Sequence, residues 1–360
     1  MLTFCRKFTM TDYILYGKQD VFHVFERILM MMKIAPAVEE SYCVLDDEPL
    51  TEAVAMELTK LEGNDILDLV SLANKVRDKF AAKGEPCSII NAKCGVCSQN
   101  CKFCAQSAHY QTKIETYDLL DVEKIVKAAK TVYDEGVRMY GIVTSGYGYL
   151  KMEDAEFQKI LAAIDALREA FPDLRVCASI GVLSDETAKA LADHGLYRYN
   201  MNLQTNPERY AELISDRHTI EEKVQTIKYL QKYGVTICCG GIFGLGESWR
   251  DRVKMAFACR ELDVDGIPLN VLLPIPGTPL EKHCIMAPCD VAKAFSIFRL
   301  VNPTKVIKFA AGRETTMKDF QGLLMLSGMN SFITGGYLTT RGRSIAEDNR
   351  FLSNLKGFMG

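Results

Sequence analysis

Eight short β-prone runs alternate with amphipathic helical stretches through most of this chain, and this alternation constrains its fold more than any other feature. The runs are Ser88–Lys93, Met139–Thr144, Arg175–Ile180, Tyr197–Leu203, Val235–Cys239, Gly266–Leu272, Lys305–Ala310 and Ser331–Thr334. The helical stretches include Glu153–Ala170, Asp185–His194, Ile220–Tyr233, Trp249–Leu262 and Thr315–Leu326. Eight strands alternating with helices predict an α/β fold, a (β/α)8 barrel, which usually takes ~250 residues. A doubly wound open sheet would also fit the alternation alone.

Two parts are expected along the chain. Residues 50–360 form the barrel domain, and residues 1–49 form an N-terminal extension that is partly irregular. Apolar residues at helical intervals, from Ile66 to Val76, predict that residues 50–82 are helical. Residues 1–33 show no regular pattern and end in three methionines, so Met32 is a candidate for the true first residue.

The composition argues against several classes of partner. Of the 360 residues 48% are hydrophobic and 25% charged, and a formal net charge of -3 gives no support for nucleic acid or an anionic membrane. No apolar run approaches the ~20 residues of a membrane span, and no secretory signal pattern is present. Thirteen cysteines in so long a chain therefore indicate reduced, cytoplasmic thiols that serve iron or zinc.

Cys97, Cys101 and Cys104 form a C-x-x-x-C-x-x-C motif in the stretch after the first predicted strand. Barrel active sites lie at the carboxyl ends of the strands and in the loops that follow, so this loop falls where a site is expected. A four-iron cluster usually takes four cysteines, and a set of three leaves one iron open to another group. A zinc site with His109 as fourth ligand is the alternative, although the spacing differs from that of paired zinc knuckles.

Five segments in register resemble the biotin synthases of the radical S-adenosylmethionine superfamily, over roughly residues 50–360. They are CSQNCKFCAQSAHY (Cys97–Tyr110), YNMNLQT (Tyr199–Thr205), GGIFGLGE (Gly240–Glu247), PLNVLLPIPGTPL (Pro268–Leu280) and AAGRE (Ala310–Glu314). The resemblance implies a homodimeric (β/α)8 barrel of the radical S-adenosylmethionine type that inserts sulfur into dethiobiotin to form biotin. It further implies a 4Fe-4S cluster that cleaves S-adenosylmethionine to a 5′-deoxyadenosyl radical, a second cluster that gives up the sulfur, and flavodoxin or ferredoxin as electron donor.

The resemblance also assigns residues to each ligand. Cys97, Cys101 and Cys104 match the ligands of the first cluster, here called the radical cluster. Contacts to S-adenosylmethionine are expected from Phe103, Asn202, Gln204, Lys223, Gly240 and Gly241, where the family usually has aspartate at Gln204 and arginine at Lys223. Contacts to dethiobiotin are expected from Asn200, Asn270, Thr339 and Thr340. Alternatively, the glycines serve only turn geometry and the asparagines only satisfy buried backbone groups.

At the second cluster the sequence departs from the family, whose usual two-iron cluster is held by three cysteines and an arginine. Cys177 and Cys238 match two of the cysteines, but Tyr140 stands for the third and Lys308 for the arginine. A phenol is an uncommon iron–sulfur ligand and an ammonium has no free lone pair. The usual two-iron site therefore cannot form, and Lys308 is expected to pair with a carboxylate or a cluster sulfide.

Additional cysteines stand nearby and point to a different second cluster. Cys87 stands where the family typically has a serine, and strand alternation places Cys94 on the opposite face from Cys87, and Cys239 opposite Cys238. We expect Cys87, Cys177 and Cys238 to hold an auxiliary cluster that is four-iron rather than two-iron, with an extra sulfide on its open iron. Packing as small buried hydrophobes is the alternative for these thiols.

Two other functions are kept as alternatives. A radical enzyme without sulfur insertion, similar to hydrogenase maturases or amino-acid mutases, would account for the missing ligands at Tyr140 and Lys308. A non-catalytic iron–sulfur or zinc protein belongs to another class, and it would form no 5′-deoxyadenosine.

Overall fold

The structure is a computed structural model that describes residues 34–81, 84–336, 338 and 342–358. The candidate start at Met32, and the candidate substrate residues Thr339 and Thr340, lie outside the described residues. Residues 36–46 belong to the expected N-terminal extension. They pack into the same hydrophobic core as the barrel domain, and Val38 and Val44 are buried there.

A parallel sheet forms the centre of the fold, and its strands are neighbours in sequence order. The path is β1 (Ser88–Lys93), β2 (Met139–Thr144), β4 (Arg175–Ser179), β6 (Arg198–Asn200), β7 (Thr236–Cys238), β9 (Gly266–Val271), β10 (Val306–Phe309) and β11 (Ser331–Phe332), and β8 (Gly241–Phe243) pairs with β9. A parallel bridge between Cys87 and Ile333 joins the last strand to the first. This bridge closes the sheet, so the predicted barrel is confirmed.

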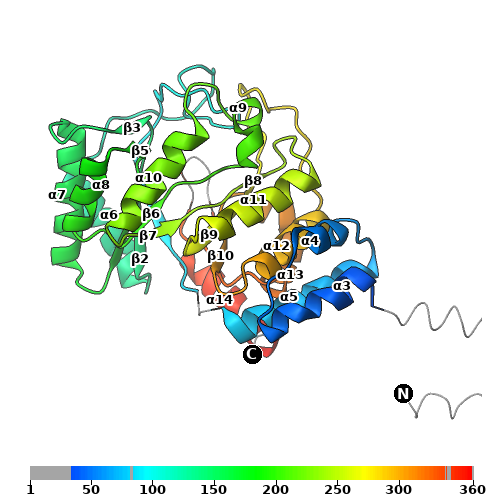
Figure 1. Cartoon of the computed structure of the whole chain (residues 1–360). Helices are drawn as coiled ribbons and strands as arrows, with labels where there is room; N and C mark the ends of the chain where they lie inside the picture. Colours follow the sequence, from blue (N-terminus) through cyan, green and yellow to red (C-terminus); the bar gives the residue numbers. More distant parts are fainter. Residues whose placement is uncertain (1–33, 82–83, 337, 339–341, 359–360) are drawn as a thin grey trace, which may run out of the picture.

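Helices follow the strands and cover the outside of the barrel (Figure 1). They are α6 (Val122–Asp134), α7 (Ala155–Ala170), α8 (Asp185–Asp193), α10 (Ile220–Lys232), α11 (Trp249–Glu261), α12 (Pro288–Val301), α13 (Gln321–Leu326) and α14 (Ile345–Leu355). Helix α10 begins with a capping box, in which the backbone of Glu222 donates to Thr219 Oγ1 at 3.2 Å and the Glu222 carboxylate accepts from Thr219 N–H at 2.7 Å. Within the described residues, no helix has both the length and the apolar character needed to cross a membrane.

The N-terminal helices lie beside α12 and α13 in Figure 1. They are α3 (Pro36–Glu40), the 3-10 helix η2 (Ser41–Asp46), α4 (Glu52–Leu58) and α5 (Asn64–Phe80). The single helix predicted over residues 50–82 is thus two helices, α4 and α5. Gly63, which adopts a positive φ of 55°, lies between them and immediately precedes α5. Glycine is the residue that accepts this conformation without a steric penalty.

Smaller departures from the predicted elements occur at the strand ends. The stretch Tyr197–Leu203 keeps only Arg198–Asn200 as strand, and a two-stranded sheet of β3 (Gly148–Tyr149) and β5 (Val182–Leu183) follows β2 and β4. The predicted helix Thr315–Leu326 is a π-helix (Arg313–Met317), a 3-10 turn (Lys318–Phe320) and α13 in succession. Periodicity alone does not distinguish such tight and wide turns from an α-helix.

Arg299 on α12 ties several loops to the barrel from a fully buried position. Its guanidinium donates to the backbone oxygens of Gly328 at 2.7 Å, Pro303 at 2.9 Å and Lys305 at 2.8 Å, and to Asn330 Oδ1 at 3.2 Å. Burial lowers the pKa of this guanidinium to about 9. Buried carbonyls need donors, so this one side chain satisfies groups that water cannot reach.

We predict that Arg299→Met lowers the free energy of unfolding by more than about 3 kcal/mol, because buried carbonyls lose their donor. The measurement is the urea midpoint of the iron-free protein. Lys130→Met is the matched control, since it removes an exposed ion pair with Asp134 and should cost less than about 0.5 kcal/mol. Equal midpoints for the two variants would contradict the assigned role.

Candidate functional site

One cavity of about 450 Å³ opens at the carboxyl ends of the strands and extends into the barrel. It brings together predicted residues that lie far apart in the sequence. Its lining includes Cys87, Cys97, Cys101, Phe103, Cys104, Cys177, Asn200, Asn202, Gln204, Lys223, Cys238 and Asn270. The fold therefore gathers the expected ligands of both clusters, the cofactor and the substrate around one space.

The three-cysteine loop leaves β1 through a tight turn at Gly95, whose φ is 81°. The loop then closes on itself, because Cys97 N–H donates to Gln106 O at 3.0 Å and Ala108 N–H donates to Cys97 O at 2.8 Å. The Cys104 N–H also donates to Cys101 O at 2.9 Å. These backbone bonds hold the three thiols on one side of the loop at the cavity mouth.

Burial raises the pKa of two of these thiols, Cys101 and Cys104, so they stay protonated unless a cation lies beside them. It raises the pKa of Cys101 to about 11, against the opposing charge of Lys223. Burial, with the neighbouring thiols Cys101 and Cys97, raises the pKa of Cys104 to about 12. A metal centre supplies the positive charge that keeps cysteines as thiolates, so the residues present fit an iron–sulfur cluster.

The described residues give the zinc alternative no specific support. Among the described residues, no three His, Cys, Asp or Glu side chains gather around one point as a single ion requires. His109, the alternative zinc ligand, places its Nε2 3.0 Å from Ser98 O in the loop itself.

A hydrogen-bonded chain fixes the tautomer of His218 near the cluster loop. Asn100 Nδ2 donates to Asp216 at 2.7 Å, so Asn100 Oδ1 is left to accept from Ser215 Oγ at 2.6 Å. The Ser215 hydroxyl proton is thereby used, and Ser215 Oγ must accept from His218 Nδ1 at 3.1 Å. His218 therefore carries its proton on Nδ1 and leaves Nε2 as an acceptor.

His218 Nε2 contacts both Tyr210 and Cys101. The Tyr210 hydroxyl lies 2.6 Å away and donates to this nitrogen, and Cys101 Sγ lies at 4.0 Å. Burial, reinforced by the charge of Lys223, lowers the pKa of His218 to about 4. The ring is thus neutral, and it orients the tyrosine hydroxyl beside a cluster ligand. Sequence reasoning missed His218 because nothing in its neighbourhood of the sequence marks it.

Two of the expected cofactor contacts, Asn202 and Gln204, lie in the segment that follows β6, and a third, Lys223, reaches it from α10. Asn202 Oδ1 accepts from Gly240 N–H at 3.1 Å, and the buried ammonium of Lys223 donates to Asn202 O at 3.1 Å. Gln204 has a positive φ of 72°, and its side-chain Oε1 is buried without a hydrogen-bond partner among the described residues. An orphaned acceptor beside a cavity suits a ligand that carries hydroxyl groups, which fits a ribose.

Packing accounts for the two glycines, Gly240 and Gly241. A Cβ on Gly240 would lie 2.1 Å from Pro268 O, and one on Gly241 would lie 2.5 Å from Gln204 O. Neither residue is part of the described cavity lining. Close approach of neighbouring strands therefore already requires glycine at both positions.

The two described substrate candidates differ in how they are held. Asn200 Nδ2 donates to Ser179 Oγ at 3.3 Å, and no described group donates to its Oδ1. Asn270 uses both ends of its amide, donating to Gly241 O at 3.1 Å and accepting from Ala311 N–H at 2.9 Å. Asn200 thus offers an acceptor to the cavity, whereas Asn270 also serves the backbone around it.

Cys87, Cys177 and Cys238 come together inside the barrel, together with the ammonium of Lys308. Lys308 Nζ lies 3.6 Å from Cys87 Sγ. Burial raises the pKa of Cys177 to about 12, against the opposing charge of Lys308 and with the other two thiols adding to the rise. As strand alternation predicts, Cys238 lines the cavity while Cys239 and Cys94 do not.

Two glycines let the backbone of neighbouring strands lie close to these cysteines. A Cβ on Gly266 would lie 2.9 Å from Cys238 Sγ, and one on Gly141 would lie 3.8 Å from Cys177 Cβ. Tyr140, which matches the family's third cysteine in sequence, does not line this site, because Gly141 faces the cavity whereas Tyr140 is buried in the surrounding core. At Gly141, between the cavity-lining residues Met139 and Val143, β2 therefore supplies no side chain beside the thiols.

Sequence reasoning also missed Arg198 on β6, a second buried cation at this site. Its Nε donates to Thr236 Oγ1 at 3.1 Å, and its Nη1 lies 4.0 Å from Met139 Sδ. Burial lowers its pKa, but the thiols of Cys238 and Cys177 outweigh this effect and raise it.

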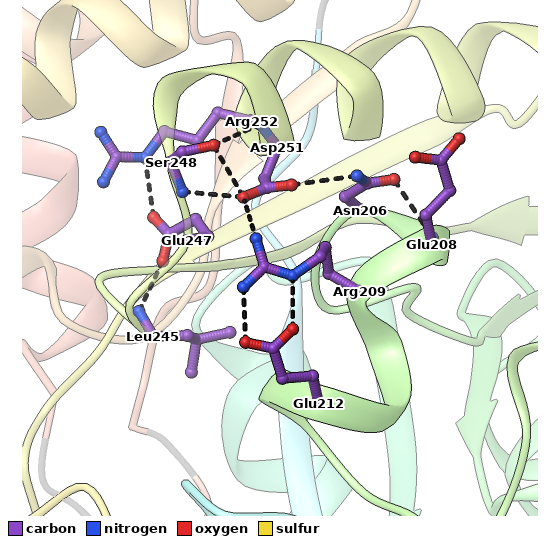
Figure 2. Close-up of polar contacts among 9 residues, drawn as sticks. All are labelled: Asn206, Glu208, Arg209, Glu212, Leu245, Glu247, Ser248, Asp251 and Arg252. Atoms are coloured by element: carbon purple, nitrogen blue, oxygen red, sulfur yellow. Dashed lines mark hydrogen bonds and ion pairs between the residues drawn. The ribbon is translucent and has the colours of Figure 1, made fainter.

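Figure 2 shows the polar contacts that fix the loop after β8 at the cavity mouth. The carboxylate of Glu247 accepts from the backbone N–H groups of Gly244 at 2.9 Å and Leu245 at 2.6 Å. It also accepts from Arg252 Nε at 2.7 Å, in an ion pair with little exposure. The loop is thereby tied to α11.

The segment after Gln204 is tied to the same helix, as Figure 2 also shows. Asp251 accepts from Asn206 Nδ2 at 3.0 Å and from Arg209 Nη1 at 3.3 Å. Arg209 in turn forms a bidentate pair with Glu212, at 2.8 and 2.7 Å. These bonds anchor the short α9 (Tyr210–Leu213), which carries Tyr210, over the cluster loop.

Comparisons with known proteins agree with this geometry. Residues 93–259 match the radical SAM superfamily model, and residues 268–357 match the biotin and thiamin synthesis associated domain. The biotin synthase of Chlorobium phaeobacteroides (strain BS1) is 53% identical over 334 residues, covering 91% of this chain and 98% of that protein. That of Chlorobaculum tepidum is 51% identical over 333 residues, covering 91% and 100%.

Solved structures show the same fold at much lower identity. Methylornithine synthase (PylB) matches with a TM-score of 0.75 at 19% identity, covering 89% of this chain and 96% of that one. The hydrogenase maturase HydG from Carboxydothermus hydrogenoformans matches with a TM-score of 0.74 at 16% identity, covering 93% and 81%. Identities this low establish a shared barrel only, so they do not favour a maturase-like function.

The barrel, its three-cysteine loop and the superfamily match define a radical S-adenosylmethionine enzyme. Membership of that class implies a 4Fe-4S cluster and S-adenosylmethionine as cofactors. Within the class, this chain belongs to the biotin synthase family, because relatives more than half identical span nearly its whole length.

We predict that His218 makes the iron-free protein less stable as the pH falls from about 6.5 to about 4. The unfolded chain takes up a proton near pH ~6.5, whereas the folded chain does not until about 4, so stability is lost across this window. His218→Gln cannot titrate and should lose roughly 1–2 kcal/mol less between pH 7 and pH 4.5. Urea midpoints at both pH values measure this, and identical acid dependence in both proteins would refute it.

Proposed function

We propose that this enzyme converts dethiobiotin to biotin by radical-mediated insertion of sulfur. One observation supports this most: a single cavity connects the three-cysteine loop at its mouth with three further thiols inside the barrel. Cys87 directly precedes β1 and Cys97 follows it, so the length of a six-residue strand, roughly 20 Å, separates the two groups. A substrate held between them would face a radical source on one side and a sulfur source on the other.

When bound, the radical cluster and S-adenosylmethionine supply a radical that removes hydrogen from unactivated carbon, and the auxiliary cluster supplies sulfur. The chain's own side chains bind and orient. Asn202 and the orphaned Gln204 Oε1 would hold the ribose, and the Lys223 ammonium would pair with the cofactor carboxylate. Phe103 packs beside the thiols against Tyr210, Leu213 and Ile214, which excludes water from the cofactor side.

Asn200 is the main candidate for substrate binding among the described residues. Asn200 lines the cavity and its Nδ2 is held by Ser179, so its Oδ1 is left to accept an N–H of the ureido ring. Asn270 would contribute less directly through the bonds it makes to Gly241 and Ala311. Thr339 and Thr340 are assigned to the substrate carboxylate on the family resemblance alone.

The auxiliary cluster is proposed to be four-iron, held by Cys87, Cys177 and Cys238, with an extra sulfide on its open iron. The support is the convergence of the three thiols with Lys308 on one cavity and the absence of any side chain at Gly141. Three thiolates leave one iron open. The ammonium of Lys308 holds no lone pair to fill it.

The remaining proposals follow from the family. Flavodoxin or ferredoxin would deliver the electron, and the enzyme would act as a homodimer. The twelve cysteines of the described chain are all free thiols, which suits the reducing cytoplasm.

We predict that anaerobically reconstituted enzyme, given dethiobiotin, S-adenosylmethionine and a reductant, forms biotin and 5′-deoxyadenosine, both measured by mass spectrometry. Cys101→Ala should abolish both products because it removes a ligand of the radical cluster. Cys284→Ala is the matched control, since this cysteine is exposed and should retain activity. 5′-Deoxyadenosine without biotin would indicate a radical enzyme of another reaction, and neither product would indicate a non-catalytic protein.

A second prediction concerns the auxiliary cluster. Mössbauer spectra of the reconstituted protein should show two four-iron clusters, and Cys87→Ala should lose or alter only the second. Cys94→Ala, which removes a buried thiol outside the cavity lining, should leave both clusters intact. A two-iron signal, or an unchanged second cluster in Cys87→Ala, would show the proposed ligand set to be wrong.

A further inference from the structure

Two buried cations face the same part of the cavity, and carboxylates balance neither of them. Lys308 is 4% exposed and Arg198 is 7% exposed. Neither forms an ion pair with a carboxylate in the part of the chain that the structure describes. The charges that act on Lys308 are the thiols Cys238, Cys87 and Cys177 and the guanidinium of Arg198.

The surroundings of Arg198 lead to the same conclusion. The carboxylate that acts on it, Asp265, does so more weakly than the thiols Cys238 and Cys177. Asp265 is also engaged elsewhere, because its Oδ2 accepts from Ile237 N–H at 2.7 Å. Buried charges are normally paired, so two cations that share one site indicate an anion.

The three thiolates do not fully supply that negative charge once they bind metal. Iron–sulfur cores carry positive charge of their own, and this charge cancels much of the charge on the cysteine ligands. Lys308 and Arg198 then face a site that still lacks negative charge. The three thiols and the two cations all line the same cavity of about 450 Å³, so a small anion has room beside them.

We propose that Lys308 and Arg198 form a binding site for hydrosulfide, taken up from solution, at the open position of the auxiliary cluster. This inference rests on the proposed function, and it gives the two cations a task other than ligation. Lys308 donates from the side of Cys87, and Arg198 donates from the side of Cys177 and Cys238. The site would thus bind the sulfur that is later transferred, and could be refilled without dismantling the cluster.

Equilibrium titration tests this site in the reconstituted enzyme. Sodium sulfide is added anaerobically to desalted protein, and binding is followed by the EPR signal of the reduced auxiliary cluster and by labelled sulfide retained after desalting. Lys308→Met and Arg198→Met should each weaken hydrosulfide binding at least about tenfold, because a buried charge partner is lost. Lys308→Arg, which keeps the charge, should stay within about threefold.

Lys293→Met is the matched control for loss of a buried lysine. Lys293 donates to Thr59 O at 3.0 Å and Leu61 O at 3.1 Å, outside the cavity lining, and its loss should leave hydrosulfide affinity unchanged. Iron content is measured for every variant. If Lys308→Met fails to assemble the auxiliary cluster, the hydrosulfide affinity of Arg198→Met alone tests the proposed site.

The outcomes separate this inference from the proposed function. A wild-type protein that holds iron for the radical cluster alone would overturn both the auxiliary cluster and this site. A wild-type protein with two clusters, whose Lys308→Met and Arg198→Met variants bind hydrosulfide as tightly as it does, would overturn this inference alone.

Discussion

The pairing of Cys87 with the last strand is the contact on which the rest of this structure depends. Cys87 N–H donates to Phe332 O at 3.1 Å, and Thr334 N–H donates to Cys87 O at 2.9 Å. These two bonds close the barrel, and they also fix the Cys87 backbone on both sides. The same residue that completes the sheet thereby presents its thiol to the interior, beside Lys308. Fold closure and the proposed auxiliary site share one residue.

The two groups of thiols meet different electrostatic conditions within one cavity. At the mouth, Cys101 lies beside the neutral ring of His218, and Lys223 is the cation that acts on it. Inside the barrel, Lys308 and Arg198 both act on Cys177. A cluster surrounded by more buried positive charge tolerates more negative charge on its sulfurs. This difference suits one group of thiols to electron transfer and the other to holding an additional sulfide.

Much of this site was predictable from the sequence, and the failures have physical causes. The three-cysteine loop and the inward-facing Cys238 were predictable, because local spacing and strand alternation determine them. Arg198 lies two residues before Asn200 and so on the same face of the strand, but it was missed because it stands outside the five segments that resemble the family. The match of Tyr140 to the family's third cysteine differs by one residue from the cavity-lining Gly141, and one residue exchanges the two faces of a strand. The chain of bonds to His218 joins separate loops, which no local pattern reveals.

The central claim is that sulfur held by Cys87, Cys177 and Cys238 becomes the sulfur of biotin. It is tested most directly by reconstituting the enzyme with 34S-labelled sulfide, removing free sulfide, and analysing the biotin from a single turnover by mass spectrometry. The account predicts labelled biotin from the wild-type enzyme and none from Cys87→Ala, although that variant still cleaves S-adenosylmethionine. Unlabelled biotin from the wild type, or labelled biotin from Cys87→Ala in wild-type yield, would contradict it.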